Sequence, residues 1–221
     1  MFRIICIIAG YIFGLFNTSL VFGKIIGVDV RKHGSGNTGT ANMLRTAGFR
    51  SGLVVLIGDT LKAVLSMLLM VFVLREQYAL NIVLIKAYTG LGCILGHNYP
   101  FYTGFKGGKG IATSFGIMLV LDWRLALFGF GTFMLVFFST HYMSLGSLSG
   151  VIAGFLPIFI SVGMIGGIGG EIIVSEQRAE FYIIISLMIF LAFFRHRENI
   201  SRLLKGEERK THLHRAKNKE K

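Results

Sequence analysis

Cysteine and negative charge are both scarce in this sequence. Only two of its 221 residues are cysteine, and Cys6 and Cys93 both lie within apolar runs. This count excludes a disulfide framework, and the spacing is not that of a metal site, so no metal is expected. Aspartate and glutamate together number 11 against 23 lysines and arginines, which gives a net charge of +12. The placement of the basic residues must therefore explain the excess.

Two common nucleotide-binding signatures are also missing. A P-loop needs four residues between its first glycine and a Gly-Lys pair that serine or threonine follows. Here Gly104 lies too close to Gly108, and a glycine follows Lys109. The run 34–39 matches the spelling of a dinucleotide fingerprint, but that fingerprint follows a strand in a βαβ unit, and membrane-like sequence flanks this run. Both nucleotide-binding folds are therefore disfavoured.

Long apolar runs dominate what is present. Hydrophobic residues make up 53% of the chain, and the mean hydropathy is +0.65. A helix needs about 20 mostly apolar residues to cross a bilayer and satisfies its own backbone groups there. We therefore predict an all-α polytopic membrane protein with seven transmembrane helices. The apolar runs lie at about residues 2–22, 52–74, 79–96, 111–122, 125–140, 146–165 and 181–194.

The basic residues favour alternate loops. Lysine and arginine concentrate at 24–50, 96–110 and 195–221, and the other loops are poor in them. The positive-inside rule then places the N-terminus outside and the C-terminus in the cytoplasm, in the cell inner membrane. The first run has no small-residue cleavage site after it, so we interpret it as a retained helix rather than a signal peptide.

This charge pattern also bounds the domains and partners. We predict a single seven-helix membrane domain over 1–205 and a basic cytoplasmic tail over 206–221. The positive charge indicates topology and contact with anionic membrane lipid, not nucleic acid. Three polar clusters fall on the cytoplasmic face, which favours one shared site there.

The central polar cluster extends from Gly96 to Gly110. It holds His97 and the run Lys106-Gly107-Gly108-Lys109. Glycine allows turns and close approach of a ligand to backbone N–H groups, and a following helix N-terminus adds partial positive charge. These features favour a phosphate-binding loop. The alternative is a flexible basic loop held by lipid phosphate.

The first polar cluster, at 31–48, combines glycines, hydroxyls, amides and arginine. Ser35 can donate to a phosphate oxygen, and Arg45 can pair with one bidentately. Asn37 and Asn42 either orient a ligand or cap a helix.

The third polar cluster, at 195–208, places His196 and Asn199 three residues apart, on one helical face. An amphipathic helix at the membrane edge is the alternative, and it explains Arg202 but not His196 beside Asn199. Glu208 is a candidate site residue or a balancing charge.

In this order, the three clusters resemble the PlsY family, the acyl-phosphate:glycerol-3-phosphate acyltransferases of bacterial membranes. The family patterns are Gly-Ser-Gly-Asn-x-Gly-x-x-Asn-x-x-Arg, Gly-His-x-x-Pro…Phe-Lys-Gly-Gly-Lys-Gly-x-Ala-Thr and Arg-His-x-x-Asn-x-x-Arg-Leu…Gly-x-Glu. They match at 34–45, 96–113 and 195–208. Asp59 and Lys62 also look like the family, and we expect a structural ion pair between them. One departure lies at 14–19, where the family has Gly-Ser-x-Pro-x-Gly and this chain reads Gly-Leu-Phe-Asn-Thr-Ser.

The resemblance implies transfer of a fatty acyl group from acyl phosphate to the 1-hydroxyl of glycerol 3-phosphate. The product would be lysophosphatidic acid, in the first acylation step of phospholipid synthesis, with no cofactor. Ser35, Arg45 and Lys109 would bind the glycerol phosphate, His196 and Asn199 would hold the glycerol hydroxyls, and the apolar bundle would take the acyl chain. The further phosphate-site residues that it implies are Gly36, Asn37, Asn42, Lys106, Gly107, Gly108, Arg195 and Glu208.

The proton acceptor has three candidates. His97 and His196 each titrate near neutrality and can act as a general base. Alternatively, the phosphate of the donor takes the proton. For His97 there is also the alternative that it only braces the loop.

Two rival functions are disfavoured. Glycerolipid acyltransferases that depend on CoA or a carrier protein use His-x-x-x-x-Asp, and no histidine here has aspartate at that spacing. A transporter of a phosphorylated solute would place its polar groups near the bilayer midplane, often in paired repeats, whereas here they gather on one face.

Overall fold

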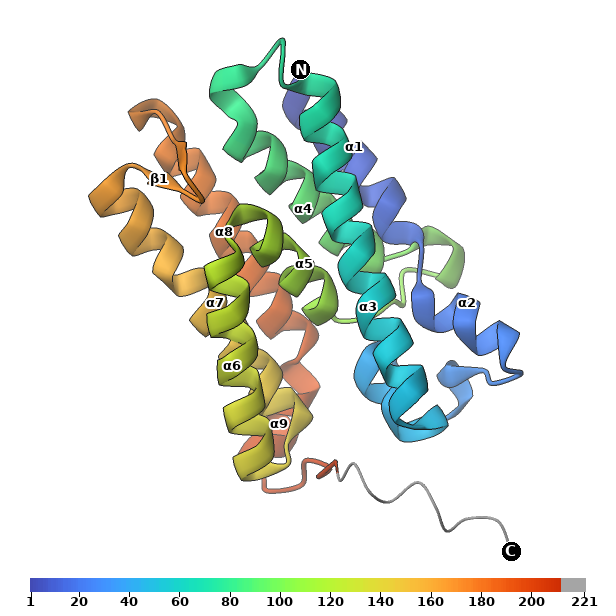
Figure 1. Ribbon diagram of the computed structural model, residues 1–221. Helices are drawn as coiled ribbons and strands as arrows, with labels where there is room; N and C mark the ends of the chain where they lie inside the picture. Colours follow the sequence, from blue (N-terminus) through green and yellow to red (C-terminus); the bar gives the residue numbers. More distant parts are fainter. Residues whose placement is uncertain (212–221) are drawn as a thin grey trace, which may run out of the picture.

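Most of the described chain is helical. The structure is a computed structural model that describes residues 1–211 (Figure 1). Of the predicted tail, 212–221 lies outside these residues. The elements are α1 (Phe2–Leu15), α2 (Thr18–Ile25), η1 (Val30–Lys32), α3 (Thr40–Leu74), η2 (Ala79–Asn81), α4 (Ile82–Asn98), η3 (Phe101–Thr103), α5 (Ile111–Leu121), α6 (Trp123–Thr140), α7 (Met143–Ile165), β1 (Gly167–Ile168), β2 (Glu171–Ile172), α8 (Ser175–Arg195) and α9 (Arg197–Leu204).

Six spans within 1–211 are long and apolar enough to cross a membrane, and α1 with α2 counts as one of them. The remaining predicted span corresponds to α5, whose 11 residues rise only about 17 Å, against a hydrocarbon core of about 30 Å. This helix is short because the glycine-rich loop before it stays non-helical as far as Gly110, and Asp122 already caps α6.

A small hairpin departs from the all-α prediction. β1 pairs antiparallel with β2, with Gly167 opposite Ile172. Gly169 and Gly170 between them both have positive φ, as a tight hairpin turn requires. The hairpin joins α7 to α8 where the sequence indicated only a glycine-rich loop.

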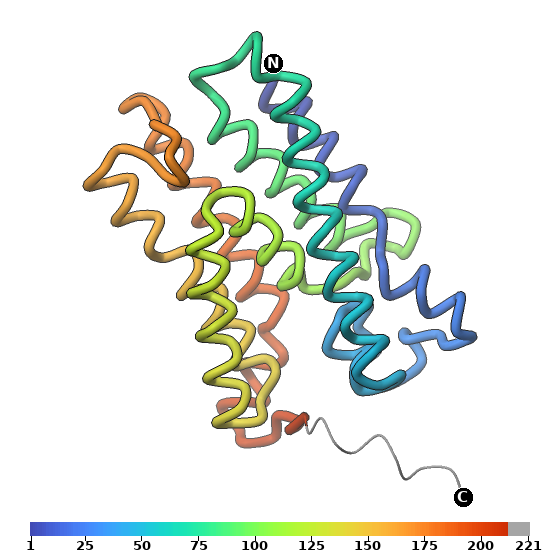
Figure 2. Tube along the Cα trace, viewed as in Figure 1, coloured from blue at the N-terminus to red at the C-terminus, as the bar shows by residue number. Residues whose placement is uncertain are grey.

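The first apolar run forms two helices rather than one. α1 ends at Leu15, and the Asn17 side chain accepts a hydrogen bond from the Leu20 amide to cap α2. Figure 2 shows the chain changing direction between them. The departure from the family pattern at 14–19 therefore coincides with a helix break, and asparagine is a strong N-cap residue.

α3 begins well before the apolar run expected from residue 52. Its first part, 40–47, is separated from the spanning part by Gly48, which has φ 82° and ψ 179°. This separate first part, about two turns long, carries Asn42 and Arg45. It therefore presents part of the first polar cluster from a helix instead of a loop.

Glycine lets α1 and α4 pack with their backbones in contact. A Cβ on Gly10 would lie 2.1 Å from the Thr89 carbonyl oxygen, and one on Gly92 would lie 2.2 Å from that of Ile7. α5 lies between α3 and the neighbouring pair α6 and α7 (Figure 1). The cavity described below lies between α3 on one side and the α6–α7 pair on the other, with α5 also lining it.

Replacing Gly92 with alanine should destabilise the protein, because the added Cβ forces α1 and α4 apart. We expect the free energy of unfolding to fall by about 1–3 kcal/mol, seen as a lower midpoint of thermal unfolding in detergent. Gly131→Ala in α6 is the matched control, since no atom elsewhere in residues 1–211 lies within 4 Å of a Cβ there. Equal midpoints for the two variants would contradict the backbone contact.

Candidate active site

One cavity of about 720 Å³ is lined by residues of all three polar clusters. Ser35 and Arg45 come from the first cluster, Lys109 from the second, and His196 and Asn199 from the third. Asn37, Asn42, His97 and Glu208 also line it, whereas its lining does not include Gly36, Lys106, Gly107, Gly108 or Arg195.

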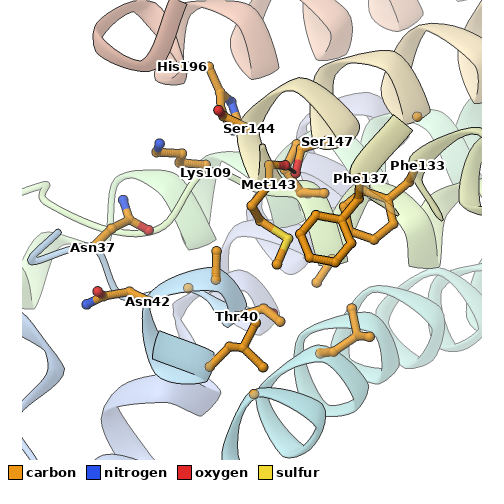
Figure 3. A pocket seen from close by; sticks show the side chains of 18 of the residues that line it. Asn37, Thr40, Asn42, Lys109, Phe133, Phe137, Met143, Ser144, Ser147 and His196 are labelled. Carbon is orange, nitrogen blue, oxygen red and sulfur yellow. Dashed lines mark hydrogen bonds between the residues drawn. The ribbon is translucent and has the colours of Figure 1, made fainter. Parts of the chain in front are cut away.

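The cavity has a polar end and an apolar wall. Figure 3 shows Lys109, Asn37 and His196 on one side and the rings of Phe133 and Phe137 on the other. The aromatic wall comes from α6, whose phenylalanines stack along one face, with the Phe133 and Phe137 rings 5.8 Å apart. The cavity therefore suits a molecule with an anionic head and an apolar chain.

Asn42 shapes the loop that presents Ser35. Its side-chain oxygen accepts from the Ser35 amide at 2.9 Å, and its nitrogen donates to the carbonyls of Val30 at 2.8 Å and His33 at 3.1 Å. Gly34 next to this contact has φ 61°, a conformation that favours glycine. All polar groups of Asn42 are thus engaged within the protein.

Backbone and arginine contacts fix the glycine-rich loop. The Gly107 amide donates to the Asn98 carbonyl at 3.1 Å, and the Gly108 amide donates to the His97 carbonyl at 3.0 Å. The Arg195 guanidinium donates to the carbonyls of both glycines, at 3.0 and 3.1 Å. The amides of Gly107 and Gly108 therefore stabilise the loop through hydrogen bonds within the protein. Lys106 is exposed to solvent.

Space also requires glycine in this loop. A Cβ on Gly107 would lie 2.1 Å from the His97 carbonyl oxygen, and one on Gly108 would lie 2.0 Å from His97 Nε2. The His97 ring is 3% exposed and fills the position that a side chain at 108 would need. The loop rests on this ring and carries Lys109 at its end.

Glu208 connects several parts of the site. Its carboxylate accepts from Asn199 Nδ2 at 2.6 Å, Ser144 Oγ at 2.8 Å and Arg202 Nε at 2.7 Å. Asn199 in turn accepts from the Lys109 ammonium. The i, i+3 spacing predicted that His196 and Asn199 share a face, but Ser144 on α7 has no motif around it that could have marked it.

The residues after α9 cross the end of the cavity. Arg45 Nε donates to the Thr211 hydroxyl at 3.0 Å, and Arg209 donates to the Gly34 carbonyl at 3.3 Å. The Thr211 amide donates to the His141 carbonyl at 2.8 Å. The described start of the tail predicted at 206–221 thus joins the first polar cluster to the loop between α6 and α7.

Burial changes the protonation of two site residues. It lowers the pKa of Lys109 to about 8; Glu208 opposes this shift, and three neighbouring arginines add to it. Burial likewise lowers the pKa of His196 to about 3, with repulsion from the Lys109 charge as the next cause. For Glu208, burial acts to raise the pKa, but hydrogen bonds from three side chains outweigh it and hold the pKa below its ordinary value.

The hydrogen bond of His196 determines its free nitrogen. Its Nδ1 lies 2.8 Å from the Ala192 carbonyl oxygen, and a carbonyl can only accept, so Nδ1 carries the proton of the neutral ring. Nε2 is then an acceptor. A hydroxyl group in the cavity can donate a hydrogen bond to it.

These features define a class: an integral membrane protein with a cationic, hydroxyl-bearing pocket beside an apolar wall. Residues 4–206 match the family model described as glycerol-3-phosphate acyltransferase. The chain therefore belongs to the glycerol-3-phosphate acyltransferase family, which confirms the PlsY resemblance predicted from the three motifs.

Relatives and solved structures agree with this family. The chain is 39% identical over 213 residues to the glycerol-3-phosphate acyltransferase of Clostridioides difficile, covering 94% of each chain. It is 36% identical over 211 residues to that of Alkaliphilus metalliredigens, covering 95% of this chain and 96% of the relative. The crystal structure of PlsY, an integral membrane glycerol 3-phosphate acyltransferase, in its glycerol 3-phosphate form has a TM-score of 0.79 and 32% identity, covering 95% of this chain and 96% of that chain. Its lysophosphatidic acid form has a TM-score of 0.77 and 31% identity, covering 96% of each chain.

Proposed function

We propose that this acyltransferase takes its fatty acyl group from acyl phosphate and transfers it to the 1-hydroxyl of glycerol 3-phosphate, giving lysophosphatidic acid. The observation that carries the proposal is the meeting of Arg45, Lys109 and His196 in one cavity that also has an apolar wall. Two phosphorylated substrates need cationic sites, and an acyl chain needs an apolar one. Family membership and the PlsY structures with glycerol 3-phosphate and lysophosphatidic acid support the acceptor and the product of this reaction.

In this proposal the phosphate of glycerol 3-phosphate binds between Ser35, Arg45 and Lys109. Arginine supplies a planar fork that matches a phosphate, and the lysine adds a point charge. Asn199 and His196 hold the glycerol hydroxyls, and the acyl chain lies along the aromatic wall of α6. Gly107, Gly108 and Arg195 act by fixing the loop, because their hydrogen bonds are made within it.

The chemistry then needs positioning rather than a covalent intermediate. His196 Nε2 accepts a hydrogen bond from the 1-hydroxyl and aligns its oxygen with the acyl carbonyl carbon. A bond forms between the hydroxyl oxygen and the acyl carbonyl carbon. The bond between that carbon and the phosphate oxygen of the donor breaks. Because the His196 ring is a weak base, with a pKa of about 3, we assign the hydroxyl proton to the departing phosphate.

The membrane placement is part of the proposal. We propose seven crossings in which α5 is the short one, with the N-terminus outside and the active site and C-terminus on the cytoplasmic side of the inner membrane. A single membrane domain over 1–205 and a basic tail over 206–221 follow from the same charge pattern. Crowding of Arg45, Lys109 and Arg202 at the cavity supports this orientation.

The choice of acyl donor tests the proposal. Purified protein in a chelator-containing buffer should form lysophosphatidic acid from glycerol 3-phosphate and acyl phosphate, and form none from acyl-CoA. The expected reason is that acyl phosphate already carries a phosphate leaving group for the cationic pocket. Product from acyl-CoA alone, or none from acyl phosphate, would overturn the donor assignment.

The Michaelis constant for glycerol 3-phosphate should rise above a pH of about 8, the pKa of Lys109. Lys109 is cationic below that pH and neutral above it, whereas a phosphate monoester is a dianion above about pH 6. The attraction between Lys109 and the phosphate is thus greatest between about pH 6 and about pH 8. Above the pKa of Lys109, KM should rise by up to about tenfold per pH unit.

Lys109→Arg is the control for this prediction, because arginine stays charged throughout this range. Its KM, whatever its absolute value, should not rise between about pH 8 and 10. A wild-type KM as flat as that of the arginine variant would show that the Lys109 charge does not bind the substrate.

A further inference from the structure

A buried ion pair lies beneath the glycine-rich loop. Lys62 Nζ and Asp59 Oδ1 on α3 are 3.0 Å apart, and their side chains are 4% and 1% exposed. The expected ion pair is therefore confirmed. Burying two charges inside a membrane bundle is costly unless they are paired and hydrogen-bonded. Their other contacts show what the pair holds.

The pair stabilises the break between α1 and α2. Lys62 Nζ donates to the Phe16 carbonyl at 2.7 Å and to the Gly14 carbonyl at 3.3 Å, where α1 ends. Asp59 accepts from the Thr18 hydroxyl at 3.0 Å, where α2 begins. Orphan carbonyls at a helix end attract a cation, and the start of a helix attracts an anion. The ammonium has only three N–H donors, so the long contact to the Gly14 carbonyl shares its donor with a fourth acceptor.

Lys62 also reaches His97. Its Nζ lies 2.8 Å from His97 Nδ1. An ammonium group has donors and no acceptor, so Nδ1 must accept, and the neutral His97 ring then carries its proton on Nε2. The two histidines of the site are therefore opposite tautomers: His196 presents an acceptor and His97 presents a donor.

The donor of His97 faces the glycine-rich loop. Its Nε2 lies where a side chain on Gly108 would project, and the ring is part of the cavity lining. The adjoining residue is Lys109, which carries the loop's inward charge. A neutral N–H at this place can donate to a phosphate or oxyanion oxygen, and it cannot take a proton from a hydroxyl.

We propose that Lys62 is a positioning residue that fixes His97 as the Nε2–H tautomer, so that His97 donates a hydrogen bond to a phosphate group bound in the cavity. This inference rests on the proposed function, because it needs a phosphorylated substrate there. It assigns His97 a role other than general base, and it gives the buried Asp59–Lys62 pair a role in the site besides capping the helix break.

The tautomer can be measured without turnover. In protein with ¹⁵N-labelled histidine rings, nitrogen–proton correlation spectra distinguish a ring protonated at Nε2 from one protonated at Nδ1. The His97 signals are assigned by their loss in His97→Gln. The expected result is an Nε2–H ring in the wild type that shifts when glycerol 3-phosphate or inorganic phosphate is added. A ring protonated at Nδ1, or no response to either ligand, overturns the inference.

Two substitutions of His97 test the donor by kinetics. The amide nitrogen of glutamine reaches the position of Nε2, whereas that of asparagine reaches only that of Nδ1. His97→Asn should lower kcat/KM by about tenfold to a hundredfold, the range for one hydrogen bond to a charged group. His97→Gln should retain most of the activity that asparagine loses. Equal losses in the two variants would indicate base catalysis or bracing instead.

Lys62→Met should change the His97 signals to a mixture of tautomers and lower kcat/KM as His97→Asn does. Asp59→Asn with Lys62→Met avoids an unpaired buried charge and should give the same spectrum. Lys86→Met is the matched control, since Lys86 also pairs with an acid, Glu171 at 2.8 Å, away from the cavity. It should change neither readout. An unchanged His97 spectrum in the folded double variant overturns the role of Lys62.

The experiments distinguish failure of the proposed function from failure of this inference. If wild-type protein makes no product from acyl phosphate but shows the Nε2–H ring and its response to phosphate, only the proposed function is contradicted. If wild-type protein is active but its His97 ring is protonated at Nδ1, only the inference about His97 is contradicted. If both Lys62 variants unfold, the wild-type spectrum and the His97 pair still decide.

Discussion

The carboxylate of Glu208 is the interaction on which the rest of the site depends. It accepts hydrogen bonds from α7, through Ser144, and from α9, through Asn199 and Arg202. Through Asn199 it also reaches Lys109 on the glycine-rich loop. A cluster of cations gathered for phosphate would repel itself when empty, and one buried acid offsets that repulsion. The third polar cluster thus assembles the pocket as well as lining it.

Burial beside an apolar wall gives these charges their strength. Electrostatic interactions are larger where water is excluded, and α6 supplies that exclusion with Phe133 and Phe137. The same burial lowers the pKa of Lys109 to about 8 and keeps His196 neutral. The polar end of the cavity therefore depends on its apolar wall. The wall excludes water, and this exclusion strengthens the charges and shifts the pKa of the site residues.

The sequence predicted the helical membrane class and the three clusters, because apolar runs and local motifs are short-range signals. It missed the break at Leu15–Asn17, although Asn17 within an apolar run is an N-cap signal. The apolar run at 111–122 located α5 (Ile111–Leu121) to within one residue, because Gly110 and Asp122 are local signals at its two ends. Contacts such as that between Lys62 and His97 could not be predicted from the sequence. They join residues 35 positions apart and depend on how α3 and α4 pack, which no local pattern encodes.

Calorimetric titration of glycerol 3-phosphate tests the convergence of the three clusters most directly. One substitution per cluster suffices: Arg45→Met, Lys109→Met and Asn199→Ala, with Lys24→Met as a control because Lys24 is exposed and does not line the cavity. We predict that Arg45→Met and Lys109→Met each weaken binding by at least about tenfold, as expected for a charge-assisted contact. Asn199→Ala should weaken it by about threefold to tenfold, as expected for a neutral hydrogen bond to a glycerol hydroxyl, and the control should bind like the wild type. Wild-type affinity in any one of the three would show that its cluster does not hold the substrate, and would contradict a shared site.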